Sequence, residues 1–175
     1  MKKFIFTLKA WPVIAIATIG LCFLTKCAAE LFGITLPDQG SLDVVKKAAG
    51  FNLTFLSILL QVLVLAPIME EFLFRGLFWK LPSKLLKVPA WVVIAFSAAL
   101  FSFAHYPDYE KIITHYRIFG SWVMYFRGID AAFLALGFFG VAQIWLYKKT
   151  GSIWCAALNH ALFNLTNLVL LFVMP

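Results

Sequence analysis

The sequence predicts an all-α fold, a polytopic membrane helical bundle with about five transmembrane helices. Of its 175 residues, 63% are hydrophobic and only 13% are charged, whereas soluble domains have about 45–50% apolar and about 25% charged residues. A soluble domain of this length could not bury so much apolar surface, so lipid must act as part of the solvent. Because a spanning helix needs about 20 mainly apolar residues, we expect residues 1–175 to form a single integral-membrane domain.

The first expected span covers residues 4–24. The basic start at Lys2 and Lys3, followed by an apolar stretch, is similar to a signal peptide. The apolar stretch is long for a signal-peptide core, however, so we interpret it as a retained N-terminal span. Lys9 can extend its amine to the near interface. A mixed-charge segment, residues 26–50, follows this span.

Four further spans follow along the chain. We expect them at residues 51–79, 89–106, 130–147 and 152–173. The connections between them are a basic loop at residues 80–87, a mixed aromatic segment at 107–128 and a short turn at 148–151.

The distribution of charge predicts the orientation. With the N-terminus inside, the segments on the inner side hold nine basic residues: Lys2, Lys3, Lys9, Arg75, Lys80, Lys84, Lys87, Lys148 and Lys149. The outer segments hold six basic and six acidic residues, so their charges balance. By the positive-inside rule, we expect a multi-pass protein with a cytoplasmic N-terminus. We expect its location to be the plasma (inner) membrane of a prokaryote. The net charge of +7 therefore indicates a lipid bilayer and no nucleic-acid partner.

Ionisable and amide side chains concentrate in three of the five spans. Central acidic or basic residues disfavour membrane insertion by about 2.5–3.5 kcal/mol each, so their placement is informative. The second, third and fifth spans contain Glu70, Glu71, Arg75, His105, Asn159, His160 and Asn164. This uneven distribution predicts a functional site formed by these three helices. The three cysteines form no disulfide or zinc-knuckle pattern.

Helical spacing assigns several contacts in advance. Glu71 and Arg75 are four residues apart and should form an ion pair in the favourable acid-first order. Glu70 points about 100° away from Glu71 and is not neutralised by that pair. His160 and Asn164 are also four residues apart, so both can aim at one point from the fifth span.

Two further local features bear on the site. Phe101 lies four residues before His105 and should pack beneath its imidazole, while Pro67 should kink the helix and free the carbonyl of Leu63. With straight helices at these boundaries, Glu70 and His105 lie at different depths in the bilayer. A shared site therefore requires the second span to begin deeper or the basic loop to dip into the membrane.

These side chains suit hydrolysis by an activated water. A carboxylate in an apolar pocket is well suited to act as a general base, and histidine or asparagine can donate to a developing oxyanion. Glu70, His105, His160 and Asn164 supply this set without a nucleophilic serine or cysteine. Ser97 and Ser102 lie near His105 in the sequence but lack the context of a nucleophile elbow.

Three motifs give a resemblance to a known family. Residues 70–75 read EExxxR, residues 101–105 read FxxxH, and residues 160–164 read HxxxN. In this order, on three predicted spans, they resemble the CPBP family, the CAAX protease and bacteriocin-processing group that is also called Abi. The likeness covers roughly residues 51–165, a motif core preceded by one N-terminal span.

The resemblance implies an intramembrane endopeptidase of the glutamic type, similar to CAAX prenyl proteases. Glu70 matches the water-activating base. His105, His160 and Asn164 match residues that position water and stabilise the oxyanion, and Glu71 with Arg75 would support the site. The implied partner is a membrane-anchored, prenylated or otherwise lipidated peptide substrate, and we expect no cofactor.

Two other interpretations stay open. Two histidines and a glutamate match a catalytic zinc ligand set, although they come from three separate helices without HExxH spacing, so we expect no metal. The chain could also be a non-catalytic immunity or partner-binding membrane protein that retains the motifs as a scaffold. In that case Glu70→Ala would preserve its biological effect. A transporter is disfavoured because the spans show no inverted repeat.

Overall fold

The structure is a computed structural model that describes residues 1–34, 36, 45, 49–50, 52–105 and 131–173. The mixed aromatic segment predicted at 107–128, most of the predicted 26–50 segment and the start of the fourth span at residue 130 lie outside these residues.

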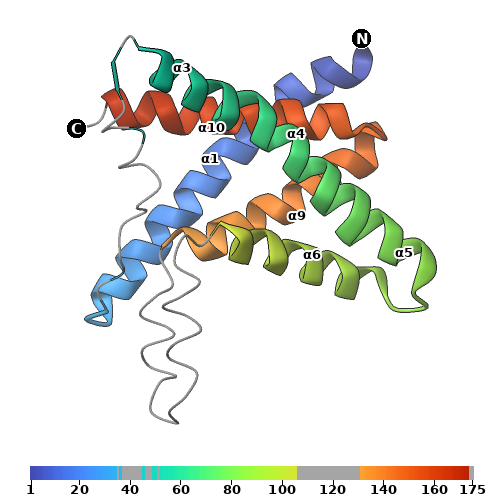
Figure 1. Ribbon diagram of the computed structural model, residues 1–175. Helices are drawn as coiled ribbons and strands as arrows, with labels where there is room; N and C mark the ends of the chain where they lie inside the picture. The colour runs from blue at the N-terminus through green and yellow to red at the C-terminus, as the bar shows by residue number, and fades with distance from the viewer. Residues whose placement is uncertain (35, 37–44, 46–48, 51, 106–130, 174–175) are drawn as a thin grey trace, which may run out of the picture.

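The described residues form helices and no strand, which confirms the all-α prediction (Figure 1). A continuous helical rod is built from α3 (Leu53–Leu60), η1 (Gln61–Leu65), α4 (Ala66–Glu71), η2 (Phe72–Lys80) and α5 (Leu81–Leu85). The other helices are α1 (Lys2–Leu31), α6 (Ala90–Ala104), α9 (Ala132–Thr150) and α10 (Ile153–Val173). The predicted basic loop is therefore helical as far as Leu85.

The bundle has the surface of a membrane protein. Three helical stretches, Lys2–Leu31, Leu53–Leu85 and Ile153–Val173, are long and apolar enough to cross a bilayer, and α6 is a shorter apolar helix. Large apolar side chains such as Leu53, Met69 and Trp91 are more than two-thirds exposed on the isolated chain. Lipid has to cover such side chains, because water would leave too much apolar surface exposed. The chain is thus an integral-membrane helical bundle.

Helix α9 lies at the centre and packs against α1, α6 and α10. The buried core at these contacts includes Phe101, Phe139 and Phe163. Helix α6 approaches α9 closely at Gly140, where an added Cβ would lie 3.2 Å from the Cα of Ala98. Small residues allow such close helix contacts in membranes, and this contact positions the end of α6 that bears His105.

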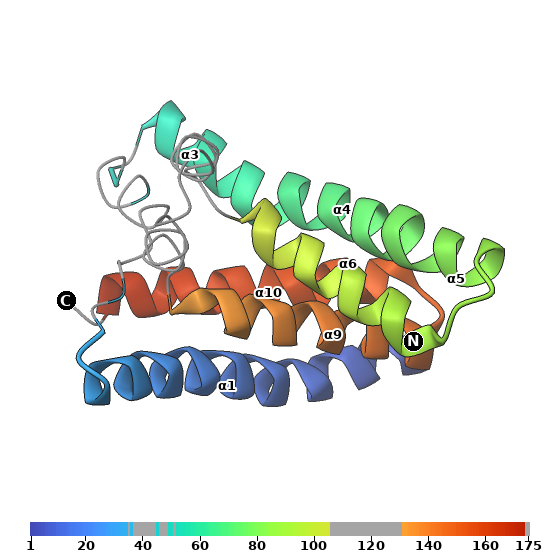
Figure 2. The ribbon, with the colours of Figure 1, turned by 90° about the horizontal axis from the view of Figure 1, so that it is seen from below.

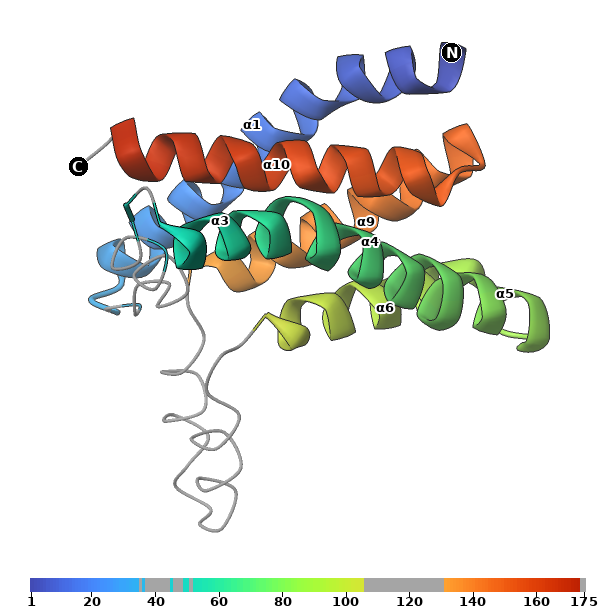
Figure 3. The same ribbon diagram turned by 45° about the horizontal axis from the view of Figure 1, so that its top comes forward.

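Helix α10 lies beside the rod (Figure 3) and packs against η1, α4 and η2. The turn before it is short because Gly151 ends α9 with a left-handed conformation at φ 64°, which glycine adopts readily. This arrangement brings the fifth predicted span against the second, as the shared site requires.

The N-terminus, the end of α5 and the turn between α9 and α10 lie at one end of the bundle (Figure 2). The basic residues assigned to the inner side gather there, except for Arg75. Arg75 is fully buried within the bundle, in the rod ten residues before its end at Leu85. Its charge is balanced by a neighbouring carboxylate instead.

The difference in depth between Glu70 and His105 disappears in the structure. Glu70 lies 15 residues before Leu85, where the rod ends (85 − 70), and His105 lies 15 residues after Ala90, where α6 begins (105 − 90). The two helices are antiparallel neighbours joined by a short connection, so equal lengths of helix bring both residues to one level. The sequence-based prediction ended the second span at residue 79. Because the helix continues to Leu85, Glu70 lies deeper along the bundle than that prediction placed it.

Both π-helical segments of the rod end just before a proline. The amide of Ala66 bonds to the carbonyl of Gln61, and the amide of Leu81 bonds to that of Gly76, each five residues back. Pro67 and Pro82 follow directly. Wide π turns are known at helix irregularities and often at functional sites, and here one of them precedes α4, which bears the two glutamates.

Candidate active site

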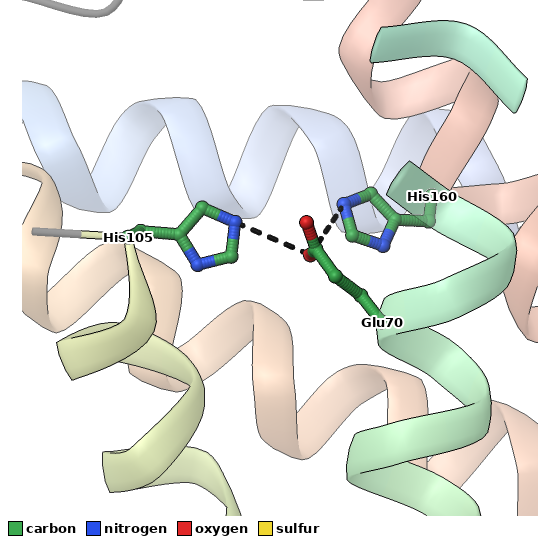
Figure 4. Close-up of side chains that lie close together, drawn as sticks. All are labelled: Glu70, His105 and His160. Atoms are coloured by element: carbon green, nitrogen blue, oxygen red, sulfur yellow. Dashed lines mark ion pairs between the residues drawn. The ribbon is translucent and has the colours of Figure 1, made fainter. Parts of the chain in front are cut away.

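Glu70, His105 and His160 converge from three helices, as the sequence predicted (Figure 4). The Oε2 atom of Glu70 lies 3.4 Å from Nε2 of His105 and 3.8 Å from Nε2 of His160. The Glu70 and His105 side chains are 27% and 28% exposed, whereas His160 is 3% exposed. The site is therefore open on the side of Glu70 and His105 and closed behind His160.

The second nitrogen of each imidazole has a partner that only accepts hydrogen bonds. Nδ1 of His105 lies 2.8 Å from the carbonyl oxygen of Phe101, and Nδ1 of His160 lies 3.0 Å from Oε1 of Glu71. Each Nδ1 must therefore bear the hydrogen and donate it. In the neutral form, both Nε2 atoms then present a lone pair toward Glu70, so three acceptors surround one point.

Glu71 links His160 to Arg75. Its Oε2 atom lies 2.9 Å from Nε of Arg75, which confirms the ion pair predicted from the four-residue spacing, and both side chains are fully buried. The opposite oxygen accepts from His160. Glu71 thus holds the imidazole from behind while Glu70, one residue earlier, faces the open side.

The ring of Phe101 forms the floor of the site. Its centroid lies 4.4 Å from that of His105 and 5.7 Å from that of His160, and the guanidinium carbon of Arg75 lies 4.9 Å from it. The predicted packing of Phe101 under the His105 imidazole is therefore confirmed. A fully buried ring in contact with three polar groups limits their rotation and excludes water beneath them.

Asn164 contacts the rod eight residues before Glu70, away from the point where Glu70 and the two histidines converge. Its Nδ2 atom donates to the carbonyl oxygen of Val62 at 2.9 Å. The proline was expected to free the carbonyl of Leu63, whereas the carbonyl that accepts from Asn164 is that of Val62. The π turn shifts the backbone pairing from four residues to five, so the missing amide of Pro67 leaves Val62 without its partner.

Sequence reasoning gave no role to three buried polar residues around the site. Ser97 donates to the carbonyl of Phe74 at 3.1 Å and joins α6 to the rod. Gln143 and Asn159 are fully buried on α9 and α10, and their amide groups have no hydrogen-bond partner within the described part of the chain. Gln143 could have been noticed as the one amide within the fourth predicted span.

The converging atoms also have the chemistry of metal ligands. One ligand atom each from Glu70, His105 and His160 lies within 4.8 Å of the others. Zinc in catalytic sites takes three such protein ligands and leaves one position for water. The hydrogen bond from His160 to Glu71 is of the kind that orients zinc-bound histidines, so this donor set fits zinc.

A comparison with protein-family models extends the motif resemblance. The model of Rce1-like type II CAAX prenyl endopeptidases matches residues 52–166, more than half of the chain. No curated protein and no solved structure matches the chain. The matched range includes the rod, α6 and the part of α10 that bears His160 and Asn164. The chain belongs to the Rce1-like family of type II CAAX prenyl endopeptidases, a family of membrane peptidases.

Proposed function

We propose that the chain is a glutamate-dependent intramembrane endopeptidase in which Glu70 activates water. The observation that supports this proposal most directly is the position of Glu70 Oε2, 3.4 Å and 3.8 Å from the two histidine Nε2 atoms. A water molecule has two hydrogens, so it can donate one to Glu70 and one to an imidazole. Its oxygen lone pair then remains free to attack a peptide carbonyl.

The two histidines have different roles in this proposal. Nδ1 of His105 donates to a neutral carbonyl, whereas Nδ1 of His160 donates to the carboxylate of Glu71. A carboxylate behind a histidine stabilises the imidazolium form. His105 therefore accepts a hydrogen from the water, and His160, as imidazolium, donates Nε2–H to the oxyanion.

The charge balance supports one imidazolium at the site. With Glu70 and Glu71 ionised, Arg75 supplies one positive charge and leaves a net charge of −1 on these groups. One imidazolium cancels that charge, which matters in a bilayer because uncompensated buried charge is costly. When Glu70 takes the proton of the attacking water, it can later pass that proton to the leaving amine, so the protons balance over one turnover.

We further propose that the substrate is a membrane-anchored peptide with a prenyl or other lipid group. Glu70 and His105 are partly exposed on a helical bundle whose surroundings are mainly lipid. A peptide anchored in the bilayer reaches such a site at high local concentration, whereas a water-soluble peptide does not. We place the N-terminus in the cytoplasm on the basis of the basic end of the bundle, and we propose the plasma (inner) membrane of a prokaryote as the location.

The test compares the wild type with Glu70→Gln in liposomes, using one farnesylated peptide with a fluorophore and a quencher on either side of the scissile region. Glu30→Gln is the matched control because Glu30 is exposed near the end of α1. Loss of a general base costs about 10²–10⁴-fold in rate, so we expect such a loss for Glu70→Gln and none for the control. Full cleavage by Glu70→Gln would refute the proposed role of Glu70.

The substrate is identified by comparing new peptide ends in membranes from cells that express the wild type or Glu70→Ala at equal levels. Ends found only with the wild type give the substrate and the cleaved bond. If folded wild type produces no new ends and cleaves no lipidated peptide, a non-catalytic immunity or partner-binding role is the better interpretation.

A zinc peptidase is the second candidate, because the two Nε2 lone pairs and one Glu70 oxygen form a three-ligand group. The two mechanisms differ in their response to chelation. Glutamate-dependent hydrolysis predicts that treatment with 1,10-phenanthroline followed by removal of the chelator leaves the rate unchanged. A loss of activity that stoichiometric zinc restores would instead assign Glu70, His105 and His160 as metal ligands.

A further inference from the structure

Helix α10 contacts the rod at two polar points on either side of Glu70. His160 meets Glu71 directly after it, and Asn164 meets Val62 eight residues before it. His160 and Asn164 are one turn apart on α10. The contact of Asn164 is with the backbone, and it is the one hydrogen bond that the Asn164 side chain makes within the described residues.

The carbonyl of Val62 needs a donor because of the local backbone. At the end of the π segment η1, the amide of Ala66 bonds to the carbonyl of Gln61, five residues back. The next amide would belong to Pro67 and would bond to Val62, but proline has no N–H. Pro67 is buried and Val62 is half-buried, and an unpaired carbonyl in a bilayer is strongly disfavoured.

We propose that Asn164 is a positioning residue, which supplies the backbone donor that Pro67 lacks and thereby holds Glu70 at its place in the site. The inference rests on the proposed function for the role of Glu70. The π turn rotates the helix that follows it by about 100° relative to a continuous α-helix, because it adds one residue. The Asn164 amide stabilises that π turn and so decides which face of the rod meets the histidines.

This role makes a prediction that direct oxyanion binding does not make. Nδ2 of Asn164 has a second hydrogen that could reach a substrate, and such a contact would not depend on residue 67. The positioning role depends on Pro67 alone. In the Pro67→Ala variant, residue 67 has its own amide and the backbone can pair without Asn164.

The experiment is a double-variant cycle of Asn164→Leu and Pro67→Ala in the purified full-length protein. Unfolding is followed by reaction of the buried Cys155 thiol with a fluorogenic maleimide, in a Cys22→Ser, Cys27→Ser background that removes the two half-buried thiols. Asn167→Leu is the matched control, since Asn167 lies on the same helix and its side chain has no hydrogen bond among the described residues. The same proteins are assayed for cleavage of the farnesylated peptide.

We expect Asn164→Leu to lower the unfolding midpoint by on the order of 2–4 °C and to reduce cleavage at least tenfold. In the Pro67→Ala background, the same substitution should shift the midpoint by less than a third as much. Asn167→Leu should give equal shifts in both backgrounds. If Asn164→Leu does not accumulate alone, the test is whether adding Pro67→Ala restores its accumulation.

Equal midpoint shifts for Asn164→Leu in both backgrounds would overturn the inference, as would a folded Asn164→Leu protein with wild-type cleavage. An unchanged midpoint with lost cleavage in both backgrounds would also overturn it and would assign the amide to the substrate. The stability cycle does not depend on activity. Failure of the proposed function is therefore seen separately, as cleavage that persists in Glu70→Gln.

Discussion

The buried pair of Glu71 and Arg75 offers a quantitative test of how the site is held. The Nε and Oε2 atoms are 2.9 Å apart and both side chains are fully buried. At an effective dielectric constant of about 20, two unit charges at that distance attract by about 6 kcal/mol. Removing one partner of a buried pair typically destabilises a protein by about 3–5 kcal/mol, because the other charge is left uncompensated.

The perturbation is a cycle of Glu71→Gln, Arg75→Met and the double variant. For a chain of this size 1 kcal/mol corresponds to about 2–4 °C in the unfolding midpoint, so each single variant should lose roughly 6–20 °C. The double variant removes both charges and should lose less than either single variant. The midpoints are measured by the Cys155 thiol reaction described above.

Cleavage should respond differently from stability in this cycle. The amide oxygen introduced by Glu71→Gln would be able to accept the hydrogen from His160, but a neutral amide would no longer stabilise the imidazolium. We therefore expect the double variant to be folded and to cleave the farnesylated peptide more than tenfold slower. Midpoint losses that simply add in the double variant would show that the two charges do not act as a pair and would refute the reasoning.

The helix contacts and the distribution of charge each give a further prediction. Gly140→Leu should force α6 away from α9, because even a Cβ at Gly140 would lie 3.2 Å from the backbone of Ala98, and cleavage should fall more than tenfold as His105 leaves Glu70. Gly20→Leu is the control, since nothing lies within 4 Å of a Cβ there, and equal cleavage by the two variants would contradict the proposed role of the α6–α9 contact. Alkaline phosphatase fused to the C-terminus should be active in the periplasm if the N-terminus is cytoplasmic, and an inactive phosphatase with a fluorescent cytoplasmic-reporter fusion would reverse the orientation.

Contacts within one helix could be predicted from the sequence, because regular spacing determines them. Glu71 and Arg75, and Phe101 and His105, are four residues apart, and both pairs are in contact. The convergence of the three motif helices was also predictable, because polar side chains in lipid must find one another. These inferences need only the helical repeat and the composition of each span.

Contacts that depend on exact helix boundaries and backbone register could not be predicted in the same way. The position of the helix end at Leu85 determines whether Glu70 and His105 lie at the same depth along the bundle. The apolar and basic residues around Leu85 suit either a loop or a helix end. The Asn164 amide donates to the carbonyl of Val62, one residue before the expected Leu63, and a π turn lies at this point of the helix. The sequence-based expectation used α-helical pairing, in which the missing amide of Pro67 would bond four residues back, to Leu63. Pairing five residues back points to Val62.

The same register explains why two adjacent glutamates have such different surroundings. Glu70 is partly exposed and faces two imidazoles, whereas Glu71 is fully buried between Arg75 and His160. Neighbouring residues on a helix point about 100° apart, so a rotation of the rod by one residue would place Glu71 near the position that Glu70 now occupies. Arg75 would rotate with Glu71, because both lie on the same rod. The site would then hold a carboxylate already neutralised by a guanidinium, which is a poor base for water. On the proposed role of Asn164, the ability of this sequence to present to two histidines a carboxylate that no guanidinium neutralises depends on the proline and π turn that precede it, as much as on the glutamates themselves.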